Sequence, residues 1–142
     1  MIHYSIEDLY LCSLKVAIEC NLEQLEQVDL TRYIKEIQKA HLQLAEHCHY
    51  PKLQDFDFPD QEIEETAFLY NNGDMIKGKG NSFQLLDPEV IEQRAMEVEK
   101  SFAKNVIKTT ILKYTNQNYQ AYLMAKYPIK KESVAVLNKR KS

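Results

Sequence analysis

Glycine occurs at three positions only, Gly73, Gly78 and Gly80, and all three lie within eight residues. Glycine readily adopts positive φ and weakens helices, so this segment is where a turn or an irregular loop is expected. The Asn72-Gly73 pair is also a strong turn signal for a hairpin. The remainder of the chain has mostly helical periodicity. The sequence therefore predicts a mainly α-helical domain with a small β-hairpin or Gly-rich loop near residues 66–83.

The composition is that of one ordinary soluble domain. The chain has 142 residues, of which 44% are hydrophobic and 27% charged. A chain of this length can form one hydrophobic core that is stable without disulfides or bound metal. No apolar run approaches the ~18 residues of a membrane helix, and the N-terminus lacks signal-peptide features. We therefore expect a cytoplasmic α-rich domain over residues 1–127, followed by a basic, flexible tail over 128–142. Cys12 and Cys20 fall in an apolar stretch and are interpreted as small core residues.

An antiparallel pair of helices is predicted at the start of the domain. Ser5 is a good N-cap for a helix from Ile6 to Asn21, extending at most to Gln27. This helix is apolar on more than one face, which is typical of a buried, central helix. Asp29 is the predicted cap of a second, amphipathic helix over residues 30–49, joined to the first by a short connection.

The second half of the chain is predicted to hold one long and one short helix. The Asp-Pro pair at 87–88 is a strong helix start, and the apolar stripe that follows predicts a helix over 88–113. Residues 106–114 are rich in β-branched side chains, so a strand is the alternative there. The polar run 115–118 predicts a break before a short helix over 119–127. The expected core consists of Leu9, Leu14, Ile18, Ile34, Ile37, Leu44, Phe68, Ile91, Val98, Phe102 and Val106.

Charge is segregated along the chain although the net charge is only −3. Residues 55–65 contain six acids and no base, whereas residues 126–142 contain six bases and one acid. Acids beside exposed aromatic rings are typical of an interface with a basic partner. Core anchoring is the alternative role for Phe56 and Phe58. The predicted partner-binding residues are Asp55, Phe56, Asp57, Phe58, Asp60 and Glu62, with a second group of Tyr70, Asn72, Asp74, Lys77 and Lys79.

No motif specifies a catalytic, metal or cofactor site. Residues 73–79 spell G-x-x-x-x-G-K, but Gly80 replaces the Ser or Thr of a phosphate-binding loop, and no helix is predicted to begin there. His41 and the run His47-Cys48-His49 lack the spacing of metal ligands. Catalytic triads assemble from distant positions, so a small enzyme stays as an alternative. We expect no enzyme activity, no cofactor and no metal.

These features favour a small protein–protein interaction module of the inhibitor, immunity or assembly-subunit type. It would act by stoichiometric binding to another protein, one whose surface is basic; self-association is left open and no membrane partner is expected. The alternative is a nucleic-acid-binding accessory protein that uses the basic tail and the Lys77–Lys79 loop, against which the net negative charge counts. The content of Lys, Asn and Ile favours an AT-rich source genome, bacterial or phage.

Overall fold

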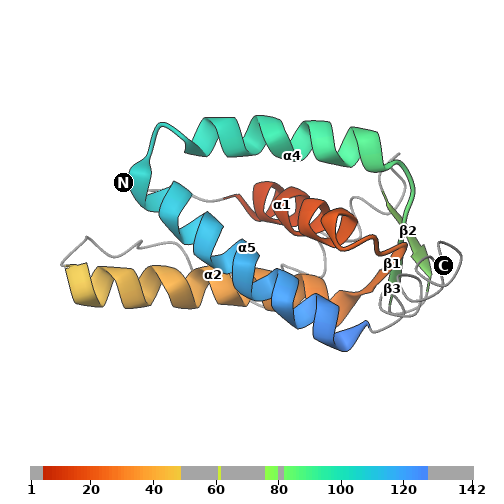
Figure 1. Cartoon of the computed structure of the whole chain (residues 1–142), viewed down its shortest axis with the longest axis horizontal. Coiled ribbons are helices and arrows are strands. Elements are labelled where there is room, and N and C mark those ends of the chain that lie inside the picture. Colours follow the sequence, from red (N-terminus) through yellow and green to blue (C-terminus); the bar gives the residue numbers. More distant parts are fainter. Residues whose placement is uncertain (1–4, 49–60, 62–75, 80–81, 128–142) are drawn as a thin grey trace, which may run out of the picture.

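The structure is a computed structural model that describes residues 5–48, 61, 76–79 and 82–127. This part of the chain is mainly helical with a small antiparallel sheet at one end (Figure 1), which confirms the predicted fold class. None of its helices is long and apolar enough to cross a membrane. The elements are α1 (Ile6–Glu19), β1 (Gln24–Glu26), α2 (Gln27–Cys48), β2 (Ile76–Lys79), β3 (Ser82–Leu85), α4 (Pro88–Phe102) and α5 (Val106–Lys126).

Helix α1 is the central element, with α4 on one side and α2 and α5 on the other (Figure 1). It is capped by Ser5, whose hydroxyl accepts a hydrogen bond from the Glu7 amide. The helix ends before Asn21, which has a positive φ of 59°. The amide of Leu22 then bonds the carbonyl of Ala17, an arrangement that closes a helix C-terminus. The predicted start is confirmed, and the extension toward Gln27 is wrong because this turn stops the helix.

The segment that follows α1 is a strand that the sequence did not predict. In the three-stranded sheet, β3 lies in the middle and pairs antiparallel with both β1 and β2. Leu25 lies opposite Phe83, and Ile76 lies opposite Leu85, all buried on one face. A hairpin is therefore present, but its strands are 76–79 and 82–85. The expected turn at Asn72-Gly73 lies outside the described residues.

The predicted long helix over 88–113 is in fact two helices. Asp87 caps α4 as predicted, because its carboxylate accepts hydrogen bonds from the second and third amides of the helix. The helix ends at Phe102, and Asn105 caps a new helix by accepting from the amides of Ile107 and Lys108. Helix α5 then continues without a break through the polar run 115–118. The alternative of a strand at 106–114 and the prediction of a separate helix at 119–127 are both wrong.

The start of α2 also differs from the prediction. The helix begins at Gln27, so Asp29 lies inside its first turn and is not its cap. The carboxylate of Asp29 is fully buried and accepts hydrogen bonds from the end of α5. The carboxylate oxygens of Asp29, which the sequence pattern predicted to cap the helix, instead accept hydrogen bonds from Tyr122 and Lys126.

The core lies between the four described helices and extends onto the sheet. Of the predicted core residues, Leu9, Leu14, Ile34, Ile37, Ile91 and Phe102 are buried, while Ile18, Leu44 and Val98 are partly buried. Val106 is 78% exposed, so its prediction is wrong. It was placed in the core by a stripe that assumed one continuous helix, whereas it is the first residue of α5. Phe68 lies outside the described residues.

Candidate functional site

Two of the sequence-predicted binding residues, Lys77 and Lys79, lie in the part of the chain that the structure describes. Lys77 is exposed on β2, and Lys79, also on β2, lies opposite Ser82 in the strand register. The acidic aromatic segment stays a prediction. The residues that lie outside the described part are Asp55, Phe56, Asp57, Phe58, Asp60, Glu62, Tyr70, Asn72 and Asp74.

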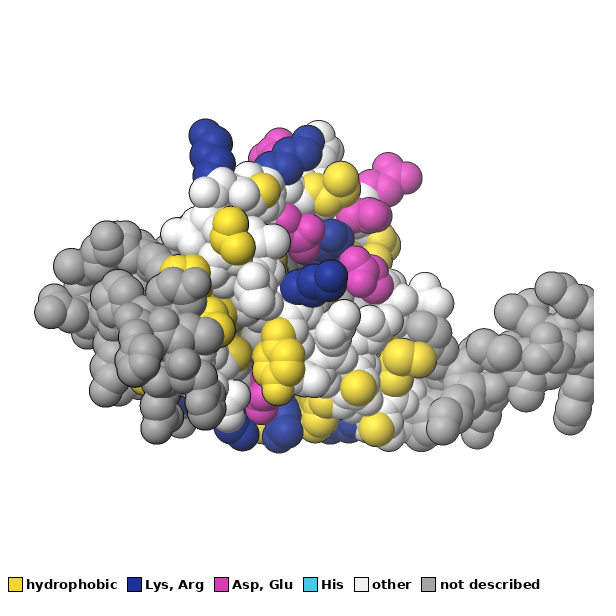
Figure 2. Space-filling model, turned by 60° about the vertical axis from the view of Figure 1, so that its left-hand side comes forward, with side chains coloured by type: hydrophobic (Ala, Val, Ile, Leu, Met, Phe, Trp, Pro, Cys, Tyr) yellow, Lys and Arg dark blue, Asp and Glu magenta, His cyan; other side chains and the backbone are white. Residues whose placement is uncertain are grey.

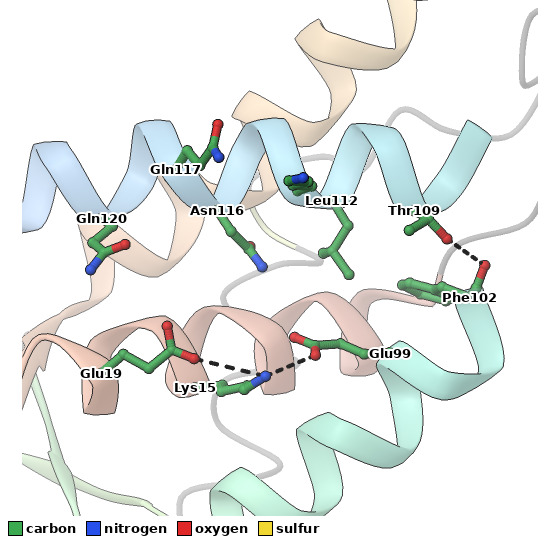
Figure 3. Close-up of a pocket in the computed structure, with 10 residues that line it drawn as sticks. Lys15, Glu19, Glu99, Phe102, Thr109, Leu112, Asn116, Gln117 and Gln120 are labelled. Atoms are coloured by element: carbon green, nitrogen blue, oxygen red, sulfur yellow. Dashed lines mark hydrogen bonds and ion pairs between the residues drawn. The ribbon is translucent and has the colours of Figure 1, made fainter. Parts of the chain in front are cut away.

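The candidate site is an open groove of about 310 Å³ at the junction of α1, α4 and α5 (Figure 3). One wall is α5, the opposite wall is α1, and the end of α4 closes one side. This volume lies at the lower end of the range for small-molecule sites, and the groove is open to solvent. Eight of the ten residues that line it are of polar or charged type; the ten are Lys15, Glu19, Glu99, Phe102, Thr109, Leu112, Lys113, Asn116, Gln117 and Gln120.

The wall formed by α1 and α4 carries a shared ion pair. The Lys15 ammonium lies 2.8 Å from the Glu99 carboxylate and 3.7 Å from that of Glu19, one turn further along α1. Burial disfavours the charge on Lys15, but the hydrogen bond to Glu99 and both carboxylates outweigh it and raise the lysine pKa. Lys15 is therefore held as a cation. The side chain of Glu19 is half exposed, so its carboxylate has capacity to bind a further group.

The opposite wall presents amide side chains from successive turns of α5. Asn116 and Gln120 both point from α5 toward α1, whereas Gln117 points away and lies at the rim (Figure 3). The hydroxyl of Tyr33 on α2 donates a 2.6 Å hydrogen bond to Oδ1 of Asn116. Since this bond occupies the amide oxygen, the Asn116 nitrogen is the end that projects into the groove. The groove therefore contains a donor whose orientation is fixed from behind.

The closed end of the groove is apolar, and the one hydroxyl group there, that of Thr109, is already hydrogen-bonded within the protein. Phe102 and Leu112 are both buried and form the apolar part of the lining. The Thr109 hydroxyl donates to the backbone carbonyls of Phe102 and Asn105, at 2.9 and 3.0 Å. The bond to Phe102 also fastens α5 to the end of α4, whereas the bond to Asn105 lies within the start of α5. Thr109 is therefore structural, and the ligand-binding capacity lies in the amides and carboxylates.

A second polar cluster surrounds Asp29, at the other end of α5. The buried carboxylate accepts hydrogen bonds from Tyr122 at 2.8 Å, from Lys126 at 2.7 Å and from Tyr127. Lys126 also lies 2.9 Å from Glu26 on β1. Burial and then the bond to Asp29 raise the pKa of Tyr122 and Tyr127. Because three donors already occupy Asp29, this cluster holds α5 to the start of α2 and has little capacity for a ligand.

Charge differs between the helices that form the groove. Helix α5 carries three lysines and no acid, whereas α4 carries four glutamates and two bases. On the face shown in Figure 2, acidic and basic side chains lie next to one another, and the hydrophobic ones are scattered among other side chains. Within the groove itself, two lysines and two glutamates balance. The groove therefore has no net formal charge with which to select a charged ligand.

The titratable side chains in and near the groove differ in how burial and neighbouring charges affect them. The described residues contain no group of three or more His, Cys, Asp or Glu side chains that could hold a metal. Burial, followed by the charge of Glu99, raises the pKa of the Cys12 thiol, so it is a poor nucleophile. Burial also lowers the pKa of His41, which lies on α2 and does not line the groove. Lys15, the titratable cation of the inner wall, is held protonated.

Sequence reasoning missed this groove, although two of its features are visible in the sequence. Lys15 is the single basic residue of α1, and the amides of 116–118 lie in an uninterrupted helical stretch. The polar run was interpreted as a break, whereas it is helical, and Asn116 and Gln117 within it line the groove. No family model, curated protein or solved structure matches the chain.

Proposed function

We propose that the chain is a protein-binding module that acts by stoichiometric association, with the α1–α4–α5 groove as its contact site. The observation that carries this proposal is the groove's composition. It is lined by amides and by a shared ion pair that can form hydrogen bonds, and Lys15 of that pair is held in the charged form that has no nucleophilic lone pair. Such a site recognises a partner without transforming it.

The shape of the groove also supports a macromolecular partner. The groove is open to solvent, whereas a small-molecule pocket covers most of its ligand. The half-exposed Glu19 and the rim residue Gln117 extend the polar surface outward from the groove. Polar rims around a central contact are typical of non-obligate protein interfaces.

A pull-down with paired variants tests the proposal. Gln120→Arg fills the groove, whereas Gln93→Arg makes the same change on the outer surface of α4, where Gln93 is exposed. Both full-length proteins should keep the wild-type circular dichroism spectrum and melting temperature. We expect one partner, captured in equimolar amount, to be lost with Gln120→Arg and retained with Gln93→Arg.

Two results would count against the groove. If both variants retain the partner, the contact lies elsewhere. The acidic segment is then tested by charge reversal of Asp55, Asp57 and Glu62, the surface predicted from sequence for a basic partner. If nucleic acid is recovered instead, and removal of residues 128–142 abolishes its capture, the accessory-protein alternative replaces the proposal.

A further inference from the structure

We infer that the groove recognises protein main chain: an extended, uncharged segment of the partner lies along α5, with its peptide groups bonded to Asn116 and Gln120. This inference rests on the proposed function and names the chemistry of the occupant. Three observations lead to it: a fixed amide donor, the spacing of two amides, and the balance of charge.

The first observation is that Asn116 is oriented before any ligand arrives. Tyr33 is fully buried, and its ring packs edge-on against Tyr119, with ring centroids 4.8 Å apart. Its hydroxyl holds Oδ1 of Asn116 at 2.6 Å, which leaves the amide nitrogen directed at the groove (Figure 3). A donor fixed in this way suits an acceptor such as a main-chain carbonyl, because little conformational entropy is lost on binding.

The second observation is the spacing of the amides. Asn116 and Gln120 lie four residues apart on one helix, which corresponds to a rise of roughly 6 Å along α5. In an extended peptide, groups on the same side repeat every two residues, about 6.7 Å apart. The two amides therefore match alternate peptide groups of one extended strand. The Gln120 amide, half-buried, offers both a donor and an acceptor, as a peptide group does.

The third observation is that the charged groups of the groove compensate one another. Lys15 is shared between Glu99 and Glu19, and Lys113 brings the formal charge of the lining to zero. A phosphate-bearing or strongly basic ligand gains little from such a site. An uncharged segment with regular donors and acceptors gains most, and main chain has both on every residue except proline.

The experiment uses the full chain and a blocked peptide, acetyl-trialanine N-methylamide, which has main-chain groups and no charge. Binding is followed by nuclear magnetic resonance of the side-chain amide groups. We expect the signals of Asn116 and Gln120 to shift and saturate as peptide is added. The amide of Gln93, on the outer surface of α4, serves as the internal reference and should not move.

Two pairs of variants test the roles assigned to the side chains. Asn116→Asp removes the fixed donor, and Asn118→Asp makes the same chemical change at an exposed position of α5. We expect the first to weaken peptide binding by about tenfold, the loss of one hydrogen bond, and the second to leave it unchanged. Tyr33→Phe removes the hydroxyl that orients the Asn116 amide, and it should also weaken peptide binding. Tyr10→Phe, which removes another buried tyrosine hydroxyl, should not.

Several outcomes would overturn the inference. The inference is wrong if the amide signals of Asn116 and Gln120 show no saturable shift, or if the amide signal of Gln93 shifts equally. It is also wrong if an oligouridine shifts these signals and the peptide does not. A further one separates the inference from the proposed function. If partner capture is lost with Gln120→Arg but is unchanged in Asn116→Asp, the groove is the contact site and main-chain recognition by the fixed amide is wrong.

Discussion

The ammonium of Lys126, in the last turn of α5, lies 2.7 Å from a carboxylate oxygen of the fully buried Asp29, in the first turn of α2. These residues are 97 positions apart in the sequence. With the hydroxyls of Tyr122 and Tyr127 on the same carboxylate, this contact ties the C-terminal end of α5 to the start of α2. Since α5 is one wall of the groove, the contact also fixes the wall that carries Asn116 and Gln120.

Asp29→Asn should destabilise the protein substantially. The substitution removes the charge that three donors share, and hydrogen bonds to charged groups contribute about 1.5–3 kcal/mol each. We expect the free energy of unfolding, measured in urea, to fall by about 2–3 kcal/mol. Glu26→Gln is the control, because it removes the exposed partner of the same lysine and should cost less than ~1 kcal/mol. Equal effects of both substitutions would show that burial of Asp29 contributes nothing.

Stability should fall at alkaline pH for a related reason. Burial and then the bond to Asp29 raise the pKa of Tyr122 and Tyr127 above the ordinary value of 10.0. The folded state therefore holds these protons more tightly than the unfolded state. The resulting stabilisation is complete below about pH 10 and is lost as the pH rises toward the folded-state pKa values. Urea midpoints should decline above pH 10, and the decline should be shallower in Asp29→Asn. A midpoint independent of pH in this range would contradict the assignment.

The buried cysteines should be inert in the native protein. Cys12 and Cys20 are 0% and 1% exposed, and burial followed by the charge of Glu99 raises the pKa of Cys12. An alkylating reagent at neutral pH should therefore leave both unmodified, as read by peptide mass mapping, and should modify both in denaturant. Rapid native labelling of Cys12 would mean that its thiol is accessible, and would reopen the enzyme alternative.

Core substitutions should separate the confirmed core prediction from the wrong one. Phe102 is 3% exposed, and Phe102→Ala should cost about 3–5 kcal/mol of unfolding free energy. Val106 lies four residues later but is 78% exposed, so Val106→Ala should change the free energy of unfolding by no more than about 0.5 kcal/mol. Thermal or urea unfolding measures both. A large loss at Val106 would favour one continuous helix over the observed break.

The sequence predicted the features that depend on neighbouring residues. Ser5 and Asp87 cap helices as expected, and the all-round apolar pattern of α1 predicted its central position. The break at Asn105 was missed although asparagine is a favoured N-cap, because the apolar stripe continued across it. The apolar periodicity across this stretch therefore outweighed the N-cap signal of Asn105 in the prediction.

The groove could not be predicted, because its parts meet only through tertiary contacts. Lys15 and Glu99 are 84 residues apart in the sequence, and Tyr33 and Asn116 are 83 apart. Nothing in the pattern around Asn116 indicates that a buried tyrosine orients its amide. The polar run at 115–118 looked like a helix break for the same reason, since Thr115 is buried and Asn116 is bonded only once α2 and α5 pack together.

Photo-crosslinking from three positions is the most direct test of the groove as a protein-binding site. A photoreactive amino acid would replace Gln117 at the groove rim, Gln93 on the outer surface of α4, or Phe56 in the acidic segment, each in the full chain. We expect Gln117 to give a single adduct, with the mass of a one-to-one complex, that an excess of unmodified chain suppresses. Gln93 should give none. An adduct from Gln93 or from Phe56, with none from Gln117, would contradict the groove as the contact site.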